Sequence, residues 1–207
     1  IADRGIWTAK KRYILNVHDS EGVRYKEPKL KMMGIEAVKS STPGICRSAI
    51  GDALKLVMVG DESKLQDFVA EFRHKFSSSP FEDVAFPRGV SSIHKYRDSA
   101  TLFRKSTPIH VRGSLVYNHE IVQRKLTKKY EQINEGEKIK FCYLRMPNPM
   151  KQNVISVPNI LPPEFSVEDY IDYDTQFAKA FLEPMKVILD TIGWKSEKSA
   201  SLEDFFV

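Results

Sequence analysis

Four consecutive residues near the start of the chain have the chemistry that binds a polyanion. Lys10, Lys11, Arg12 and Tyr13 follow one another, and the segment 11–17, KRYILNV, is typical of a β-strand. In a regular strand Lys11 and Tyr13 share one face, and Lys10 and Arg12 share the other. Lysines placed in this way could meet base-edge acceptors in a minor groove, while the tyrosine hydroxyl could bind a backbone phosphate. A solvated basic edge is the alternative interpretation of the motif.

Catalytic groupings are missing from the sequence. Two-metal phosphoryl transfer needs at least two carboxylates aimed at a common point, and the sequence offers only one acidic cluster to weigh for this role. The acidic run YIDYDT at 170–175 precedes an expected helix, whose N-terminus favours negative charge. Cys46 and Cys142 lack zinc-ligand spacing, and we expect both to be buried thiols in a reducing cytoplasm. The sequence therefore predicts no catalytic residue and no metal site in this chain.

The C-terminus ends in apolar residues after the polar run KSEKSAS. In the terminal stretch SLEDFFV, Ser201 and Asp204 have the spacing of a capping box. Leu202 and Phe205 lie three residues apart and would share one helical face. Such a turn forms a small hydrophobic plug for a partner protein. The alternative is a tail that packs against the protein's own core. The predicted docking peptide comprises Ser201, Leu202, Glu203, Asp204, Phe205, Phe206 and Val207.

Periodicity indicates the elements that hold these motifs. The first half predicts a β-hairpin over 11–34, then a helix with Thr42 as N-cap and Pro43 at its first position. Gly60 ends that helix and Asp61 caps the next, which closes at the run SSSP.

The second half begins with an irregular polar segment over 81–107, which we expect to form loops and a short helix. A helix is predicted from Ile109 to Gly136, then strands over 138–146 and in NVISV, and a last helix over 173–192 kinked by Pro184. The predicted fold class is α+β and mostly helical: an N-terminal β-hairpin leads into a helical domain with a small strand element and a flexible C-terminal tail.

Composition limits the class of partner. The chain has 207 residues, a net charge of +5 and a pI near 9.1, which favours an acidic partner such as nucleic acid. No apolar run approaches the roughly 20 residues that span a bilayer, so no membrane association is predicted. Because the chain starts at Ile1 without a methionine, we expect it to begin partway through a longer protein; a separate subunit of a split protein is the alternative.

Four sequence blocks occur in one order: KKRYILNVHDSEG, LKMMGIEAVKSSTP, IHVRGSLVYN and the terminal SLEDFFV. Together they resemble the C-terminal part of the replicative B-family DNA polymerases of T-even-type bacteriophages. The resemblance spans nearly the whole chain. It implies a palm-edge hairpin with the KKRY motif over 1–37, a thumb domain over 38–195, and a linker with a sliding-clamp-binding tail over 196–207.

The resemblance also implies the residues that touch DNA. Asp19 matches an acidic family position but also fits an ordinary turn aspartate. Ser41 and Thr42 match the thumb-entry block, although helix capping explains them as well. A structural salt bridge is the alternative for the arginine of IHVRG. The implied DNA-binding residues are Lys10, Lys11, Arg12, Tyr13, Lys31 and Arg112.

The function implied in this way belongs to a larger enzyme. This part would hold the primer–template duplex behind the active site of a DNA-directed DNA polymerase, a nucleotidyltransferase, and tether it to the sliding clamp. The family carries a D-T-D-type carboxylate motif in its palm, and this chain has no such triplet. Mg²⁺ and dNTPs would bind the palm region of the complete polymerase, so we expect the chain alone to be inactive. Its partners would then include the upstream palm, fingers and exonuclease part. The expected location is the cytoplasm of an infected bacterial host.

Two other classes of function remain open at this stage. One is a stand-alone, non-catalytic accessory protein that binds duplex DNA and uses the same clamp peptide. The other is a structural interaction protein with no DNA role.

Overall fold

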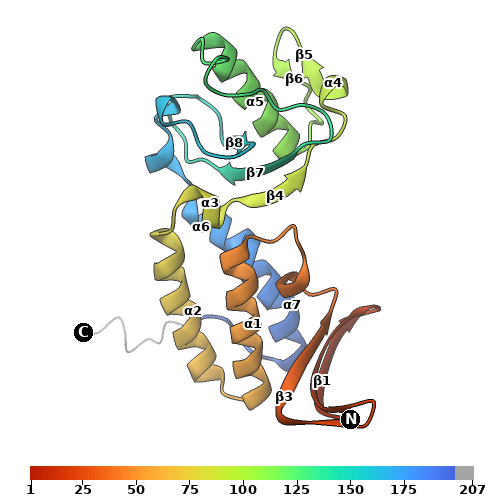
Figure 1. Cartoon of the computed structure of the whole chain (residues 1–207). Coiled ribbons are helices and arrows are strands. Elements are labelled where there is room, and N and C mark those ends of the chain that lie inside the picture. The colour runs from red at the N-terminus through yellow and green to blue at the C-terminus, as the bar shows by residue number, and fades with distance from the viewer. Residues whose placement is uncertain (199–207) are drawn as a thin grey trace, which may run out of the picture. The chain divides into compact units, whose positions relative to one another are not determined.

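The chain folds into two compact units (Figure 1). The computed structural model describes residues 1–198. Unit 1 comprises Ile1–Ser78 and the chain from Phe177 onward, and unit 2 comprises Ser79–Gln176. The boundaries of these units differ from those of the predicted functional segments 1–37, 38–195 and 196–207. The division into functional segments stays a prediction.

Unit 1 opens with a three-stranded antiparallel sheet in the order β1-β2-β3. The strands are β1 (Ala2–Ala9), β2 (Arg12–Ser20) and β3 (Val23–Met33). The β2–β3 hairpin confirms the predicted entrance. The sequence analysis missed β1, because Ile6 is the only buried residue in a strand that otherwise carries charged, small and exposed residues.

The two faces of this sheet differ in their surroundings. Ile6 pairs with Ile14, which pairs with Met32, and the two isoleucines are buried. We call this face the inner face. The opposite face, which we call the outer face, carries the alternate residues: Gly5 and Trp7 on β1, Tyr13, Leu15 and Val17 on β2, and Lys29, Lys31 and Met33 on β3.

The helices of unit 1 follow the predicted order. After the short 3₁₀ turn η1 (Glu36–Val38) come α1 (Gly44–Val59) and α2 (Glu62–Ser77). Gly60 ends α1 with a left-handed φ of 87°, and Asp61 caps α2 by accepting from Lys64 N at 3.0 Å, as predicted. The prediction of Thr42 as N-cap is wrong. Pro43 occupies that position with an extended ψ of 141°, so the helix begins one residue later.

An aromatic cluster forms the core between the helices of unit 1. The chain re-enters this unit at Phe177 and continues through the π-helical turn η4 (Ala178–Leu182) into α7 (Glu183–Ile192). Pro184, where a kink was predicted, is the second residue of α7. The rings of Phe72 and Phe181 lie 5.0 Å apart and those of Phe76 and Phe177 lie 5.3 Å apart. All four phenylalanines are buried. Residues from both ends of the sequence thus share one core.

Unit 2 is built on a second antiparallel sheet in the order β4-β7-β8. The strands are β4 (Phe86–Gly89), β7 (Lys138–Tyr143) and β8 (Val154–Val157), and α5 (Ile109–Gln123) packs on β8. A Cβ on Gly113 would lie 2.8 Å from Ser156 N, so glycine allows the close approach of helix and strand. The predicted helix end at Gly136 is wrong, because α5 ends at Gln123 and Gly136 lies in the turn before β7.

Short elements complete unit 2. The segment predicted to be irregular contains α3 (Phe81–Val84), α4 (Ile93–Tyr96), β5 (Arg97–Asp98) and β6 (Leu102–Phe103). Further along lie the 3₁₀ turns η2 (Pro163–Phe165) and η3 (Glu168–Tyr170), and then α6 (Tyr173–Phe177). Within residues 1–198, no helix has the length and apolar character needed to cross a membrane.

Candidate nucleic-acid interface

Lys10 and Lys11 form the tight turn between β1 and β2, and both are exposed. Their predicted alternation across two faces of a strand is wrong, because β2 begins only at Arg12. Lys11 has a left-handed φ of 60°. Gly34 lies against this turn: it has a φ of 67°, and a Cβ there would lie 2.5 Å from the carbonyl oxygen of Lys11. The turn therefore presents two adjacent cations on a closely supported backbone.

Arg12 is engaged in a bidentate ion pair next to this turn. Its guanidinium donates to the Glu36 carboxylate at 2.9 Å and 2.6 Å, and to the carbonyl of Gly34 at 2.8 Å. The two charged side chains are only 18% and 19% exposed. Burial opposes the ionisation of Glu36, but hydrogen bonds from Arg12 and Lys39 outweigh it, so that the pKa of Glu36 lies below its usual value. This geometry suits a role in fixing the turn.

Tyr13 and Lys31 lie on the outer face of the sheet. Tyr13 pairs with Met33, and Leu15 pairs with Lys31, in neighbouring rows of the β2–β3 register. Lys31 is exposed and Tyr13 is partly exposed. The structure thus brings Tyr13, Lys31 and the Lys10–Lys11 turn together at one end of the sheet, while their contact with DNA stays a prediction.

Trp7 belongs to the same surface and was missed by the sequence analysis. It pairs with Tyr13 across β1 and β2, and 61% of it is exposed. A tryptophan has a large apolar ring and one polar N–H group, which is the kind of side chain found at binding surfaces. The signal in the sequence was the segment GIWTA directly before the lysines, where Ile6 and Trp7 occupy opposite faces of a strand.

Arg112 lies in unit 2, near the start of α5. Its guanidinium carbon is 5.4 Å from the ring centroid of Phe103, and its Nε atom is buried without a hydrogen-bond partner. Among residues 1–198, Arg112 forms no ion pair, which disfavours the salt-bridge alternative. A contact between Arg112 and DNA stays a prediction.

Two other sequence-selected residues have local structural roles. The Asp19 carboxylate accepts a hydrogen bond from Gly22 N at 3.1 Å, which is the turn role expected of an aspartate. Thr42 is buried, and its backbone N donates to the carbonyl of Lys39 at 3.2 Å. Lys39 in turn pairs with Glu36, so this loop supports the Arg12 ion pair.

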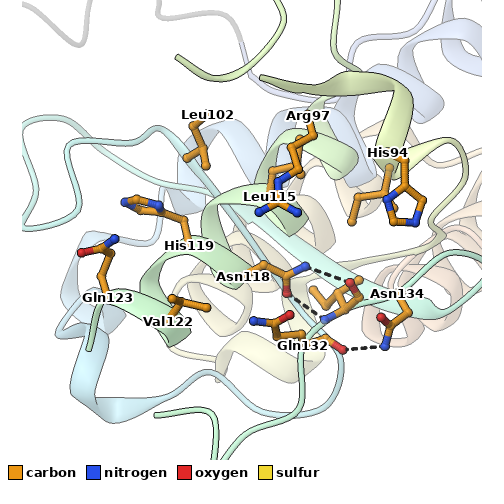
Figure 2. A pocket seen from close by; sticks show the side chains of 12 residues that line it. His94, Arg97, Leu102, Leu115, Asn118, His119, Val122, Gln123, Gln132 and Asn134 are labelled. Atoms are coloured by element: carbon orange, nitrogen blue, oxygen red, sulfur yellow. Dashed lines mark hydrogen bonds between the residues drawn. The ribbon is translucent and has the colours of Figure 1, made fainter. Parts of the chain in front are cut away.

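Unit 2 has a cavity of about 280 Å³ beside α5 (Figure 2). Asn118 braces one wall, because its side chain donates to the carbonyl of Ile133 and accepts from Ile133 N, both at 2.8 Å. Arg97, Leu115 and His119 also line the cavity. The volume is at the lower end for small-molecule sites. This mixture of apolar, amide and cationic groups selects no single ligand class.

The two cysteines and the acidic run YIDYDT occupy structural positions in the described part of the chain. No group of three or more histidine, cysteine or acidic side chains is placed to hold a metal ion within residues 1–198. Cys46 and Cys142 are buried free thiols, as predicted; burial raises the pKa of Cys46 to about 12. Asp172 of the YIDYDT run caps α6 by accepting from Thr175 N at 3.0 Å, as the helix-start interpretation requires.

The polar segment before the predicted docking peptide contacts α2. Lys195 N donates to Glu62 at 2.8 Å, and Lys198 pairs with Asp67 at 2.7 Å. Arg73 also pairs with Glu197. The docking peptide itself, Ser201 to Val207, lies outside the described residues, so its role stays a prediction.

Comparison with known proteins finds similarity to two phage DNA polymerases. No protein-family model matches the sequence. The chain is 32% identical over 206 residues to the DNA-directed DNA polymerase of Enterobacteria phage T4 and 35% identical over 206 residues to that of Escherichia phage RB69. Each match covers 98% of this chain and 22% of the relative, so the chain spans less than a quarter of the length of these curated relatives.

Proposed function

Because this chain is related to a segment of T4-type phage DNA polymerases, we propose that it holds the primer–template duplex behind the active site of such an enzyme. The Lys10–Lys11 turn carries this proposal. It presents two exposed cations beside Tyr13 and Lys31 on the same end of one sheet. Cations and a hydroxyl on a rigid β scaffold fit contacts to phosphates and minor-groove acceptors, which hold a duplex without reading its sequence.

The rest of the polymerase supplies the chemistry in this proposal. The metal ions and dNTPs bind in the palm region of the complete polymerase, because two-metal phosphoryl transfer needs carboxylates aimed at a common point. The chain alone is then a binding part without polymerase activity. The complete enzyme acts as a B-family polymerase in the cytoplasm of an infected bacterium, with this chain as its palm edge and thumb.

The C-terminal peptide is the proposed anchor for the sliding clamp. A tether of this kind raises the effective concentration of the polymerase at the ring and prolongs each binding event. Replacing Phe205 and Phe206 together with alanine should abolish co-elution with the sliding clamp of the same replication system. The melting temperature should stay unchanged, whereas a large fall would support a tail that packs on the protein's own core.

A salt series on a charge-reduced variant tests the DNA role. The chain carrying Lys10→Ala and Lys11→Ala is titrated with a fluorescent recessed-end duplex by anisotropy at several salt concentrations. Each lost phosphate contact lowers the steepness of log K against log salt by about 0.9, so the double variant should lose about 2 units of slope. A matched control is Lys55→Ala with Lys64→Ala, which removes the same charge from exposed positions on α1 and α2.

The outcomes separate the proposal from its alternatives. Equal losses of affinity and slope in the two double variants would refute a specific role for the turn. Equal affinity for recessed-end and blunt duplexes would favour the stand-alone accessory protein. Absence of any salt-sensitive binding would favour a structural protein without a DNA role.

A further inference from the structure

The outer face of the first sheet carries an indole that lies over a glycine. A Cβ built on Gly5 would lie 2.5 Å and 2.6 Å from two ring carbons of Trp7 and 2.8 Å from a methyl carbon of Leu15. The indole therefore extends along β1 across the position of Gly5, with its edge near Leu15. Only a glycine leaves room for this arrangement. Despite these contacts 61% of Trp7 is exposed, so much of the ring remains open to solvent.

Cations flank this aromatic surface. Lys31 lies in the row of Gly5 and Leu15, and Lys29 lies in the next row opposite Val17. Three neighbouring rows of paired residues make up this part of the outer face, and none of them contains an acidic residue. The rows are Trp7–Tyr13–Met33, Gly5–Leu15–Lys31 and Val17–Lys29. A ring that offers a π-face next to a line of lysines fits a ligand with a flat apolar part and a nearby anion.

We propose that Trp7 is a stacking platform for an unpaired nucleobase of DNA, with Lys31 and Lys29 neutralising the adjacent phosphates. The inference rests on the proposed DNA-holding function and adds a subsite for single-stranded or unpaired nucleotides. Bases inside a duplex already have both faces stacked, whereas an unpaired base has a free π-face for the indole. Base–aromatic stacking is tolerant of sequence, so the platform should accept any base.

Tryptophan emission gives a direct readout of this contact. The chain has two tryptophans, and replacing Trp194 with phenylalanine leaves Trp7 as the only source of emission. In this background a single-stranded DNA 12-mer should quench the emission of Trp7 with the same midpoint as a parallel anisotropy titration. A blunt duplex of the same length should bind with much weaker quenching.

Variants distinguish stacking from a structural role. Trp7→Ala should weaken single-strand binding about five- to hundredfold, the range typical of losing one stacked base. Gly5→Ala keeps the tryptophan but its Cβ displaces the indole, so it should reproduce much of that loss. Trp7→Phe retains an aromatic ring and should restore most of the affinity. Melting temperatures of all three variants control for unfolding.

Each result supports or overturns the inference. Quenching that follows binding of single strands, together with the two losses and the rescue, supports it. Binding by anisotropy without any change in the emission of Trp7 overturns it while leaving the DNA-holding function intact. No binding to any DNA overturns both. Quenching by blunt duplex but not by single strands assigns Trp7 to duplex contact and overturns the stacking of an unpaired base.

Discussion

The ion pair between Arg12 and Glu36 offers a test that separates positioning of the basic turn from contact with DNA. Arg12→Ala removes a bidentate, charge-assisted pair and the hydrogen bond to Gly34 O, and leaves a mostly buried carboxylate with only Lys39 as partner. Hydrogen bonds to charged groups contribute about 1.5–3 kcal/mol, so the free energy of unfolding should fall by about 2–3 kcal/mol. The melting temperature should fall by roughly 10 °C.

A double-mutant cycle isolates the pair. Arg12→Ala, Glu36→Gln and the double variant are compared by urea unfolding, and the coupling energy should be at least about 1 kcal/mol. The matched exposed pair Lys55–Asp52 should give about 0.5 kcal/mol or less. Strict additivity of Arg12→Ala and Glu36→Gln would refute the claim that this pair holds the turn.

DNA affinity of the same variants then assigns the role of Arg12. If Arg12 acts by positioning the turn, Glu36→Gln weakens duplex binding even though it removes a negative charge. If Arg12 touches DNA directly, as the family resemblance implies, Arg12→Ala weakens binding whereas Glu36→Gln leaves it unchanged or strengthens it. The opposite signs for Glu36→Gln make anisotropy titration decisive.

Two further predictions concern acid stability and helix packing. The pKa of Glu36 is lower in the folded protein than its usual 4.5. The ionised Glu36 therefore contributes fully to the free energy of unfolding above that pH, and this contribution is lost as the pH falls through the pKa of the folded protein. The stability difference between the unchanged chain and Glu36→Gln, measured by thermal unfolding, should therefore shrink below about pH 4.5; a constant difference would contradict the shift. Gly113→Ala should destabilise unit 2 by about 1–3 kcal/mol because its Cβ would crowd the Ser156 backbone. Gly89→Ala, in the same unit and with nothing within 4 Å, is the control, and equal urea midpoints for the two variants would refute the packing argument.

Local signals in the sequence were enough to place most of the helices. Gly60 and Asp61 lie side by side and mark the end of α1 and the start of α2, because a left-handed glycine and an aspartate cap are strongly position-specific. The strands over 138–143 and 154–157 were also found. The first was predicted from alternating residues, and the second is a short run of buried, mostly apolar residues. Fold class follows from these elements and was predicted correctly.

Features that depend on non-local contacts were not predictable. The strand β1 shows little apolar alternation, and its pairing with β2 is what moves Lys10 and Lys11 into a turn. The partner of Arg12 lies 24 residues away, so no local pattern reveals the ion pair. The end of α5 was misplaced because the helix stops at Gln123 without a glycine, while the residues that follow are still good helix formers. The candidate DNA surface was therefore predicted in its residue types but not in its geometry.

The discontinuity of unit 1 has a consequence for synthesis on the ribosome. Unit 2 is one continuous stretch, Ser79–Gln176, whereas the phenylalanine core of unit 1 needs Phe72 and Phe76 from before that stretch and Phe177 and Phe181 from after it. Translation proceeds at about 5–20 residues per second, so roughly 100 residues of unit 2 are synthesised before Phe177 and Phe181 can contact Phe72 and Phe76. The inserted unit can thus complete its fold first, and the unit that begins the chain finishes last. In that interval Phe72 and Phe76 of α2 are not yet covered by their partners, so a chaperone that binds nascent chains would contact this helix.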